Sequence, residues 1–519
     1  MSVLARSSEP AAGTRASERV LVLAPMSVEA RAVRAGAPWA QVQRIGMGPR
    51  RAARSAASAA DRGRAVLVAG FCGALDPALV PGDIVLASEL RDPSGVAVET
   101  ADPAILAGVL RRGGLRVHVG PIASSARIVR GERRRELSRT GALAVDMESA
   151  WLAPAVHDRP FLTLRVVLDT GSRELHRPLQ TLSGFTTAYR ALRRACELAE
   201  EWSSALGDRE VMLASPRASC AGVDRAIEIV ETVLRERGAP VYVRKQIVHN
   251  AHVVGHLEEL GAVFVEELDA VPDGATVVFS AHGVSPAVRA DAARRGLDVI
   301  DATCPLVSKV HAEARRFARA GFDIVLVGHE GHEEIEGTLG EAPERTRVIA
   351  SEAEVETLEV QDPARVAYLT QTTLAVDETA VVVDALRSRF PEAVGPPSSD
   401  ICYATQNRQD AVRALAQECD LVLVVGSENS SNSRRLVEVA QRAGCESVLV
   451  DGAEQITPAA LAGAHRVGIT AGASAPEALV QRVVEALGGL GAVNVSERRV
   501  ATEKMHFKLP PEVSRQRSQ

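Results

Sequence analysis

The sequence has 519 residues, of which 46% are hydrophobic and 24% are charged, and its net charge is −6. This length is too great for one ordinary core, because single cores usually stop growing at about 250 to 300 residues. The composition is globular, no apolar run is long enough to cross a bilayer, and the acidic balance argues against nucleic-acid binding. We therefore expect two or more folded domains that bind neither a membrane nor a nucleic acid.

The first residues, MSVLARSSEPAAGTRASE, contain no apolar segment of the kind found in a secretory signal. We expect residues 1–18 to be a disordered lead-in and the protein to be cytoplasmic. Two domains are expected to follow, at 19–207 and 211–512, with a tail at 513–519.

The first half repeats one pattern, a short apolar run followed by small or polar residues and then by a helical stretch. The runs are RVLVLAPMSVEA at 19, AVLVAGFCGAL at 65, DIVLASEL at 83, LAVDMESA at 143 and FLTLRVVLDTGS at 161. Such alternation predicts an α/β domain whose strands are largely buried. The segment 186–207 then predicts a closing amphipathic helix.

The second half repeats this pattern from Val211, and its strand ends carry many reactive side chains. They read VMLASPRASC, VYVRKQIVHN, TVVFSAHG, LDVIDATC, DIVLVGHEGH, VAYLTQTT, LVLVVGSENSSNS and VGITAGAS. Ligands of open α/β sheets bind at the carboxyl ends of strands, so these side chains predict a common binding site. Ordinary loop polarity is the alternative explanation, and a long series of such ends makes it the weaker one.

Three of the seven cysteines fall at these strand ends, namely Cys220, Cys304 and Cys402. Their separations of 84 and 98 residues suggest three α/β modules of similar size, each giving one thiolate to a common centre. Thiolates are the ligands of iron-sulfur clusters, and three of them leave a fourth iron open to substrate. The remaining cysteines are expected to be small buried hydrophobes: Cys72, Cys196, Cys419 and Cys445.

The stretch GHEGHEEIEG at 328–337 contains two histidines and four glutamates directly after the apolar run DIVLV. A zinc site is one explanation, although histidines three residues apart without an HExxH frame match one poorly. We expect a strand-end loop in which His332 and Glu334 face a substrate, while Glu330 and Glu333 are solvated.

Residues 211–512 resemble the 4-hydroxy-3-methylbut-2-enyl diphosphate reductase (LytB/IspH) family. The motifs, which occur in the family's order, are CAGVDRA (220–226), VHN (248–250), SAHGV (280–284), DATCPLV (301–307), GHEGHEEIEGT (328–338), TQTTL (370–374), DICYATQNRQ (400–409), GSENSSNS (426–433) and TAGASAP (470–476). The resemblance implies reductive dehydroxylation of an allylic alcohol diphosphate to isopentenyl and dimethylallyl diphosphate, in the methylerythritol phosphate pathway of isoprenoid synthesis. It also implies a 4Fe-4S cluster, held by the three cysteines at the centre of three α/β modules.

The resemblance further implies roles for individual polar residues. Glu334 is expected to protonate the departing hydroxyl, with Thr372 in the same hydrogen-bond network and His332 nearby. Substrate and diphosphate contacts are expected from His249, His282, His332, Thr372, Ser430, Ser431, Asn432 and Ser474. The Ser- and Asn-rich loops are also typical helix N-caps, and a cap that faces the cleft is an anion site. Because no dinucleotide or flavin signature is evident, electrons are expected from an external ferredoxin or flavodoxin.

The motif before the first cysteine departs from the family pattern. The family usually has Gly and an aromatic residue there, whereas this sequence has Ala218 and Ser219. The departure leaves open an alternative function, a sensor or scaffold that carries the cluster without turnover beside a non-catalytic nucleoside-binding domain. We favour an active reductase, because the three cysteines and the substrate residues are all present.

Residues 19–206 resemble the nucleoside phosphorylase and nucleosidase superfamily, which includes methylthioadenosine/S-adenosylhomocysteine nucleosidase and the phosphorylase-like protein of hopanoid gene clusters. The motifs are APMSVEARAV (24–33), IGMGP (45–49), GFCGALDPALVPGDIVLA (70–87), AVDMESA (144–150) and RVVLDTGS (165–172). The resemblance implies a three-layer α/β domain that cleaves a purine nucleoside. Its pairing with an isoprenoid reductase suggests hopanoid side-chain assembly, in which an adenosylhopane loses adenine.

Cleavage of an N-glycosidic bond needs a carboxylate near the ribose and an acid for the leaving base. By resemblance Glu148 holds the ribose hydroxyls, Asp169 protonates the purine and Glu29 positions an attacking water. Non-catalytic explanations also exist for these three residues: a helix-start charge, a strand-end cap and a surface carboxylate, respectively. Under the phosphorylase alternative, phosphate would be bound by Gly46, Gly48 and Arg50.

Overall fold

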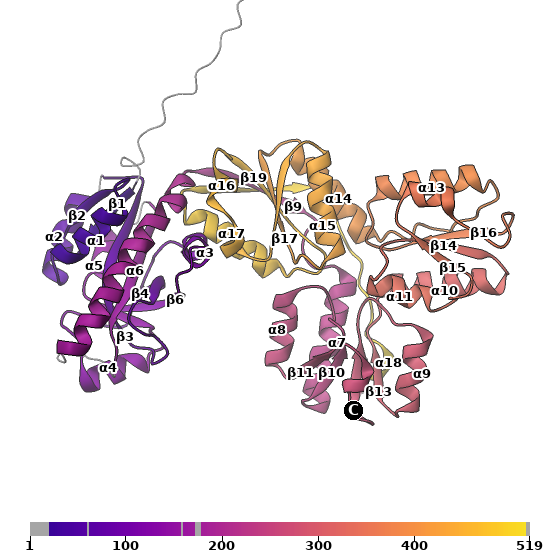
Figure 1. Cartoon of the computed structure of the whole chain (residues 1–519), viewed down its shortest axis with the longest axis horizontal. Coiled ribbons are helices and arrows are strands. Elements are labelled where there is room, and N and C mark those ends of the chain that lie inside the picture. The colour runs from indigo at the N-terminus through magenta and orange to yellow at the C-terminus, as the bar shows by residue number, and fades with distance from the viewer. Residues whose placement is uncertain (1–19, 60–61, 157–158, 172–177, 515–519) are drawn as a thin grey trace, which may run out of the picture. The chain divides into compact units, whose positions relative to one another are not determined.

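The computed structural model describes residues 20–59, 62–156, 159–171 and 178–514 (Figure 1), so the expected lead-in at 1–18 lies outside the described residues. The chain divides into two compact units. The first comprises Met1–Val211, Gly452–His465 and Gln481–Asn494, and the second comprises Met212–Asp451, Arg466–Val480 and Val495–Gln519. The extents 19–207 and 211–512 remain our proposal for the two sequence domains. Among the described helices, none combines the length and the apolar character needed to cross a membrane.

The first unit contains an eight-stranded mixed sheet with the order β2-β1-β3-β7-β6-β4-β5, in which β8 pairs with both β3 and β4. Its strands are β1 (Val20–Ala24), β2 (Gln41–Arg44), β3 (Ala65–Ala74), β4 (Ile84–Arg91), β5 (Ala97–Val98), β6 (Val117–Ser124), β7 (Ala144–Asp146) and β8 (Phe161–Asp169). Because β8 joins β3 to β4 while β7 and β6 join the same two strands by another route, the pairings close into a ring. The predicted α/β fold is confirmed for this unit.

Helices cover this sheet and explain the burial of its strands. They are α1 (Ser27–Gly36), α2 (Pro49–Ala59), α3 (Ala104–Arg112), α4 (Gly131–Ser138), α5 (Ser149–Leu152) and α6 (Pro178–Ser204). The long helix α6 packs against α1, α3 and β8, as the closing helix of the sequence analysis was expected to do (Figure 1). Strand β3 is buried along almost its whole length, which is the pattern of a strand covered on both faces.

The second unit contains three separate sheets, so the predicted three α/β modules are confirmed (Figure 1). Their orders are β11-β10-β12-β13, β15-β14-β16 and β18-β17-β19-β9-β20. The strands are β9 (Arg209–Ser215), β10 (Val241–Arg244), β11 (Ala262–Val265), β12 (Thr276–Phe279), β13 (Asp298–Asp301), β14 (Asp323–Val327), β15 (Thr346–Ile349), β16 (Val366–Thr370), β17 (Leu421–Val425), β18 (Glu446–Val450), β19 (Arg466–Ala471) and β20 (Val493–Arg499). We refer to these sheets and their helices as the first, second and third modules.

Parallel pairing within each module requires crossover helices. The helices that follow β9 in the chain are α7 (Ala221–Arg237), α8 (Ala251–Glu259), α9 (Pro286–Arg294), α10 (Pro305–Arg319), α11 (Glu333–Leu339), α12 (Glu352–Thr357), α13 (Val376–Arg389), α14 (Tyr403–Ala416), α15 (Ser431–Arg442), α16 (Pro458–Leu461), α17 (Glu477–Gly488) and α18 (Pro511–Ser514). Val513 of α18 is buried in the apolar core of the first module.

The chain passes from one module to the next at each of the three cysteines. Cys220 links β9 of the third sheet to α7, whose apolar face lies in the first module's core. Cys304 links β13 of the first sheet to α10, which packs in the second module's core. Cys402 precedes α14, which packs in the third module's core, but it follows a loop after α13 rather than a strand. The expectation of a strand end is therefore wrong for Cys402 alone.

The turn between β9 and α7 contains a strained residue. Ala218 has φ of 59°, in the left-handed region, and is 4% exposed. A residue with a Cβ atom pays about 1 to 2 kcal/mol in this region, and glycine does not. Part of that advantage is lost, because the greater conformational entropy of glycine stabilises the unfolded chain by about 0.4 to 1 kcal/mol.

We expect Ala218→Gly to stabilise the second unit and to raise its thermal unfolding midpoint by about 2 °C, measured by calorimetry. The control is Ala290→Gly at an exposed position inside α9, where glycine lowers the midpoint. A lower midpoint in both variants would show that the turn imposes no strain on Ala218.

Candidate functional site

Cys220, Cys304 and Cys402 line a single cavity in the second unit. Each cysteine is the N-cap residue of a helix, so each sulfur lies at the positive end of a helix dipole. A Cβ atom at Gly222 would lie 2.8 Å from Cys304 Sγ and 3.8 Å from Cys220 Sγ. The glycine therefore leaves the space in which these two sulfurs approach the start of α7.

The electrostatics of the thiol groups fit a soft metal centre. Burial, together with the neighbouring cysteines, raises the pKa of Cys304 to about 12 and that of Cys402 to about 11. Three thiolates in one buried cavity therefore need a compensating cation. A set of three sulfur donors suits an iron-sulfur cluster, so the donor chemistry, the helix starts and the space beside Gly222 all fit that group.

Glu334 lies in the same cavity and is held by Thr372 through two contacts. The backbone N–H of Thr372 donates to Glu334 Oε1 at 2.7 Å, and its hydroxyl donates to Oε2 at 2.9 Å. Burial raises the pKa of Glu334, and the two hydrogen bonds from Thr372 oppose that shift. The result is a fixed carboxyl group that keeps its proton to higher pH than an exposed glutamate does.

His332 is the N-cap of α11, which begins at Glu333. Its Nδ1 accepts the N–H of Glu334 at 3.1 Å, so its Nε2 carries the proton in the neutral ring. Burial, aided by the charges of His282 and His249, lowers the pKa of His332 to about 3. His332 therefore faces the cavity as a neutral hydrogen-bond donor.

The other two cavity histidines stack on each other, and one of them contacts a glutamate. The rings of His249 and His282 lie 4.2 Å apart at an angle of 23°. Burial and the charge of His282 lower the pKa of His249 to about 4, so this ring is neutral at physiological pH. Glu333 Oε2 lies 2.8 Å from His282 Nδ1, and both side chains are 16% exposed. The expectation that Glu333 is solvated is therefore wrong, because its side chain turns toward His282, whereas Glu330 is exposed as expected.

Small polar side chains complete this end of the cavity at the start of α15. Ser430 caps the helix by accepting the N–H of Ser433, and Ser474 donates to the carbonyl of His249 at 2.9 Å. Asn432 is 5% exposed, and within the described part of the chain neither its amide nitrogen nor its amide oxygen has a hydrogen-bond partner. Ser431 contacts Thr373 at 3.2 Å. Unpaired polar atoms at a helix N-terminus are suited to bind an anion.

Tyr403 and Phe507 also line this cavity, and sequence reasoning gave neither a role, although Tyr403 lies in the quoted DICYATQNRQ motif. Phe507 is distant in sequence from every motif, so only the fold reveals it. Of the cysteines outside the cavity, Cys196 and Cys445 are buried hydrophobes as expected, whereas Cys419 is only partly buried.

A second cavity lies in the first unit and brings together Glu29, Glu148 and Asp169. All three carboxylates are less than one-tenth exposed, which argues against the explanation that Glu29 is a surface carboxylate. Cys72 is buried as expected but also lines this cavity.

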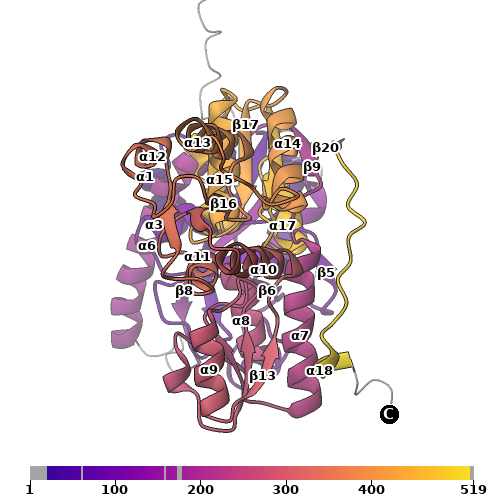
Figure 2. The same ribbon diagram turned by 90° about the vertical axis from the view of Figure 1, so that its right-hand side faces the viewer.

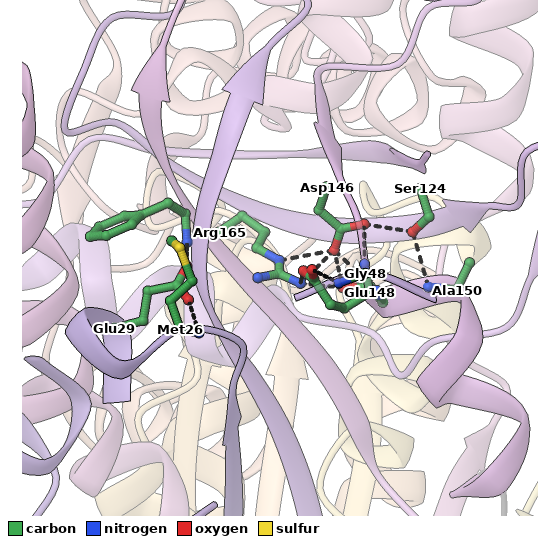
Figure 3. Close-up of polar contacts among 10 residues, drawn as sticks. Met26, Glu29, Gly48, Ser124, Asp146, Glu148, Ala150 and Arg165 are labelled. Atoms are coloured by element: carbon green, nitrogen blue, oxygen red, sulfur yellow. Dashed lines mark hydrogen bonds and ion pairs between the residues drawn. The ribbon is translucent and has the colours of Figure 1, made fainter. Parts of the chain in front are cut away.

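Arg165 forms ion pairs with two of the carboxylates that line this cavity (Figure 3). Its Nη2 atom lies 2.6 Å from Asp146 Oδ2 and 3.2 Å from Glu148 Oε2, and its side chain is fully buried. Burial raises the pKa of Glu148 to about 7, although Arg165 opposes that shift. Burial also raises the pKa of Glu29, whose two oxygens accept the N–H groups of Phe71 and Met26 at 2.6 Å each. Sequence reasoning missed Arg165, although it lies in the quoted RVVLDTGS motif.

Asp169 is held by a second buried arginine that sequence reasoning also missed. Arg134 Nη1 donates to Asp169 Oδ2 at 2.8 Å, and Arg134 is 4% exposed. The Gly48 N–H donates to Glu148 Oε1 at 2.9 Å, so this donor is already used within the protein. Arg50 is exposed on α2. These positions weaken the assignment of Gly48 and Arg50 to phosphate binding.

Two family descriptions match the chain. Residues 211–488 match the LytB protein family, and residues 40–202 match the phosphorylase superfamily. The chain is 58% identical over 316 residues to 4-hydroxy-3-methylbut-2-enyl diphosphate reductase 2 of Mycobacterium bovis, an alignment that covers 60% of this chain and 96% of that protein. It is 60% identical over 308 residues to the reductase of Leifsonia xyli, which covers 59% of this chain and 91% of that protein.

A solved structure shows the same relationship in three dimensions. The E-1-hydroxy-2-methyl-but-2-enyl-4-diphosphate reductase of Plasmodium falciparum is 37% identical, with a TM-score of 0.58, and the match covers 60% of this chain and 99% of that one. The LytB match covers more than half of the chain, and its curated relatives are aligned over almost their whole length. The first unit carries a phosphorylase-superfamily domain, and the chain as a whole belongs to the LytB protein family.

Proposed function

We propose that the second unit reduces 4-hydroxy-3-methylbut-2-enyl diphosphate to isopentenyl and dimethylallyl diphosphate, with release of water. The observation that carries this proposal is the meeting of three cysteines with Glu334, three histidines and an unpaired Asn432 in one cavity. When bound to the cysteines, a 4Fe-4S cluster supplies the electrons and a Lewis-acidic iron for the substrate hydroxyl.

The protein's own residues supply the proton and hold the substrate. Glu334 is the proton donor to the departing hydroxyl, because burial keeps its carboxyl protonated and Thr372 fixes its direction. His332 donates Nε2–H to the substrate as a neutral ring. The diphosphate is bound by His249, His282, Ser430, Ser431, Asn432 and Ser474, where the start of α15 provides a favourable dipole.

The test is anaerobic purification followed by assay of substrate reduction with reduced viologen in place of the external ferredoxin or flavodoxin. We expect iron and acid-labile sulfide in equal amounts and consumption of the allylic diphosphate. Cys304→Ser is expected to lose both metal and activity, because sulfur ligation fails at one of three points. Metal-loaded protein without turnover would support the alternative, a sensor or scaffold, and protein without iron and sulfide would overturn both.

Thr372→Val tests the proton donor. The hydroxyl of Thr372 lowers the pKa of Glu334, so its loss raises that pKa further and keeps the acid protonated to higher pH. We expect kcat to fall by about tenfold as the carboxyl loses its orientation, while the alkaline limb of the pH profile moves to higher pH. The matched control is Thr379→Val, which changes a buried threonine of α13 whose hydroxyl donates to the carbonyl of Ala375, the N-cap residue of that helix. An unshifted alkaline limb would assign the proton donor elsewhere.

We further propose that the first unit cleaves a purine nucleoside. Its support is the superfamily match together with the cavity that collects Glu29, Glu148 and Asp169. Glu148, with a pKa of about 7, holds the ribose hydroxyls. Glu29, whose two oxygens are fixed by backbone N–H donors, positions the attacking water. Asp169, whose carboxyl group is held by Arg134, protonates the leaving purine. Because Gly48 already binds Glu148, hydrolysis is favoured over phosphorolysis.

The proposed substrate of this unit is adenosylhopane. Two exposed apolar side chains at the cavity support an apolar substituent on the sugar, since Met47 is 45% exposed and Ile128 is 51% exposed. Adenine release from methylthioadenosine but not from adenosylhopane by the full chain would overturn this choice.

Glu148→Gln is expected to reduce adenine release by at least about 10²-fold, because the ribose is no longer held in its reactive position. Adenine is measured by liquid chromatography. Glu132→Gln, an exposed glutamate on α4, is the control and retains activity. Equal rates in the two variants would indicate that the cavity is not the nucleosidase site.

A further inference from the structure

Each helix that begins at a cavity cysteine carries a long cationic side chain about one and a half turns later. These residues are Arg225 on α7, Lys309 on α10 and Arg408 on α14, which follow Cys220, Cys304 and Cys402 by five, five and six residues. None of the three contacts the turn before its own cysteine in the hydrogen bonds described below. Each instead binds the turn before another of the three.

Arg225 binds the turn that leads to Cys304. Its Nη1 donates to the carbonyls of Ala302 and Thr303 at 3.2 and 3.1 Å. Its Nε donates to the carbonyl of Lys508 at 2.8 Å. Arg225 also lies within electrostatic reach of the Cys304 sulfur.

Lys309 binds the turn that leads to Cys402. Its Nζ donates to the carbonyls of Ser398 and Ser399 at 2.8 and 3.0 Å and contacts Asp400 Oδ1 at 3.2 Å. Asp400 is fully buried, and it accepts the N–H of Thr370 through its other oxygen. The lysine is therefore fixed between helix α10 and the last residues before the third cysteine.

Arg408 binds the turn that leads to Cys220 and thereby completes the circuit. Its Nη2 donates to the carbonyls of Ala218 and Ser219 at 2.7 and 3.2 Å, and its Nε donates to Ala218 at 3.0 Å. Its Nη1 donates to the carbonyl of Ala404 and to Glu503 Oε1, both at 3.0 Å. The guanidinium group is fully buried.

We propose that Arg225, Lys309 and Arg408 form a closed ring of clamps that fixes the three cysteine turns relative to one another before and during cluster binding. We call this set the cation ring. It rests on the proposed function, because it serves the cysteines as cluster ligands. The direction is cyclic: the helix of the first cysteine holds the turn of the second, the second holds the third, and the third holds the first.

Three physical arguments separate the cation ring from ordinary surface ion pairs. Its contacts are mainly backbone carbonyls, so each clamp fixes the course of the chain immediately before a ligand rather than a mobile side chain. Arg225 and Arg408 are less than one-tenth exposed, so water competes little for their bonds. The three positive charges also lie on the helices that begin at the thiolates, where they oppose the cost of collecting negative sulfur ligands.

The segment after β20 contacts two members of the cation ring (Figure 2). Glu503 accepts from Arg408 and from Asn407, each at 3.0 Å, and the carbonyl of Lys508 accepts from Arg225. In Figure 2 this segment runs from β20 to α18 along one side of the unit. It therefore joins two of the three clamps through a single stretch of chain.

The experiment replaces each clamp by methionine, which keeps an unbranched side chain but removes the donors. Iron and sulfide content, the electron paramagnetic resonance spectrum of the cluster and the rate of iron loss to a chelator are measured in the full chain under anaerobic conditions. Lys309→Met, Arg225→Met and Arg408→Met are each expected to lose iron about tenfold faster and to broaden the spectrum. Lys309→Arg, which keeps donors at that position, is expected to restore the slow rate.

The matched controls are Arg316→Met on α10, which removes an exposed arginine, and Arg413→Met on α14, which removes a half-buried one. Variants that lose iron no faster than these controls would overturn the cation ring. Wild-type protein that binds no iron and sulfide would instead overturn the proposed function. Lys309 is 29% exposed, so its variant carries the test if a buried arginine variant does not fold, as judged by circular dichroism.

Ring closure makes a further prediction that independent clamps do not. One broken clamp already opens the circuit, so a second substitution adds less than its own single effect. We expect the iron-loss rate of Arg225→Met with Lys309→Met to lie well below the product of the two single increases. A double variant whose iron-loss rate equals the product of the two single increases would show that the two clamps act independently, and it would contradict a closed ring.

Discussion

The second unit depends on one constraint, the convergence of three thiol groups at the places where the chain leaves one module for the next. Cys220, Cys304 and Cys402 each begin a helix whose apolar face belongs to a different core from the segment before it. The position of each sulfur is therefore set by two modules at once. A small error in packing between modules becomes an error in ligand position, which explains why strong backbone contacts gather at these turns.

Burial sets the acid–base properties of both cavities, but the two compensate for it differently. Burial raises the pKa of Glu334, and the hydrogen bonds from Thr372 and the charge of His282 offset that shift only in part. In the first unit, Arg165 faces Asp146, Glu148 and Glu29, and one guanidinium cannot neutralise three carboxylates. Glu148 therefore titrates near pH 7. The same desolvation keeps the Glu334 carboxyl group protonated to higher pH in one cavity and leaves Glu148 partly protonated near neutral pH in the other.

Much of the fold follows from the sequence, because alternating apolar runs and helical stretches predict α/β modules directly. The converging cysteines were also predictable, since three thiols at similar spacing point to a shared centre. The direction of the Glu333 side chain was not. A helix that begins at Glu333 turns two adjacent carboxyl groups to different partners, and the letters EE do not show where the helix begins.

Arg134 shows the same limit in the first unit. It lies in the run RRR, which has the pattern of a solvated basic helix, and its two arginine neighbours are indeed exposed. A contact with Asp169, 35 residues later, buries Arg134 alone. The local sequence pattern predicts that residues on such a helix are exposed, but a single long-range ion pair can bury one of them.

The placement of the cysteines at module junctions has a consequence for biosynthesis. A ribosome completes the first unit's sheet and the turn of Cys220 long before it reaches Cys402, so the donor set stays incomplete until late in translation. Until then Cys220 and Cys304 lie beside modules whose packing is not yet complete. Any group that binds all three sulfurs at once can therefore be held only after Cys402 has been synthesised and the three modules have packed together.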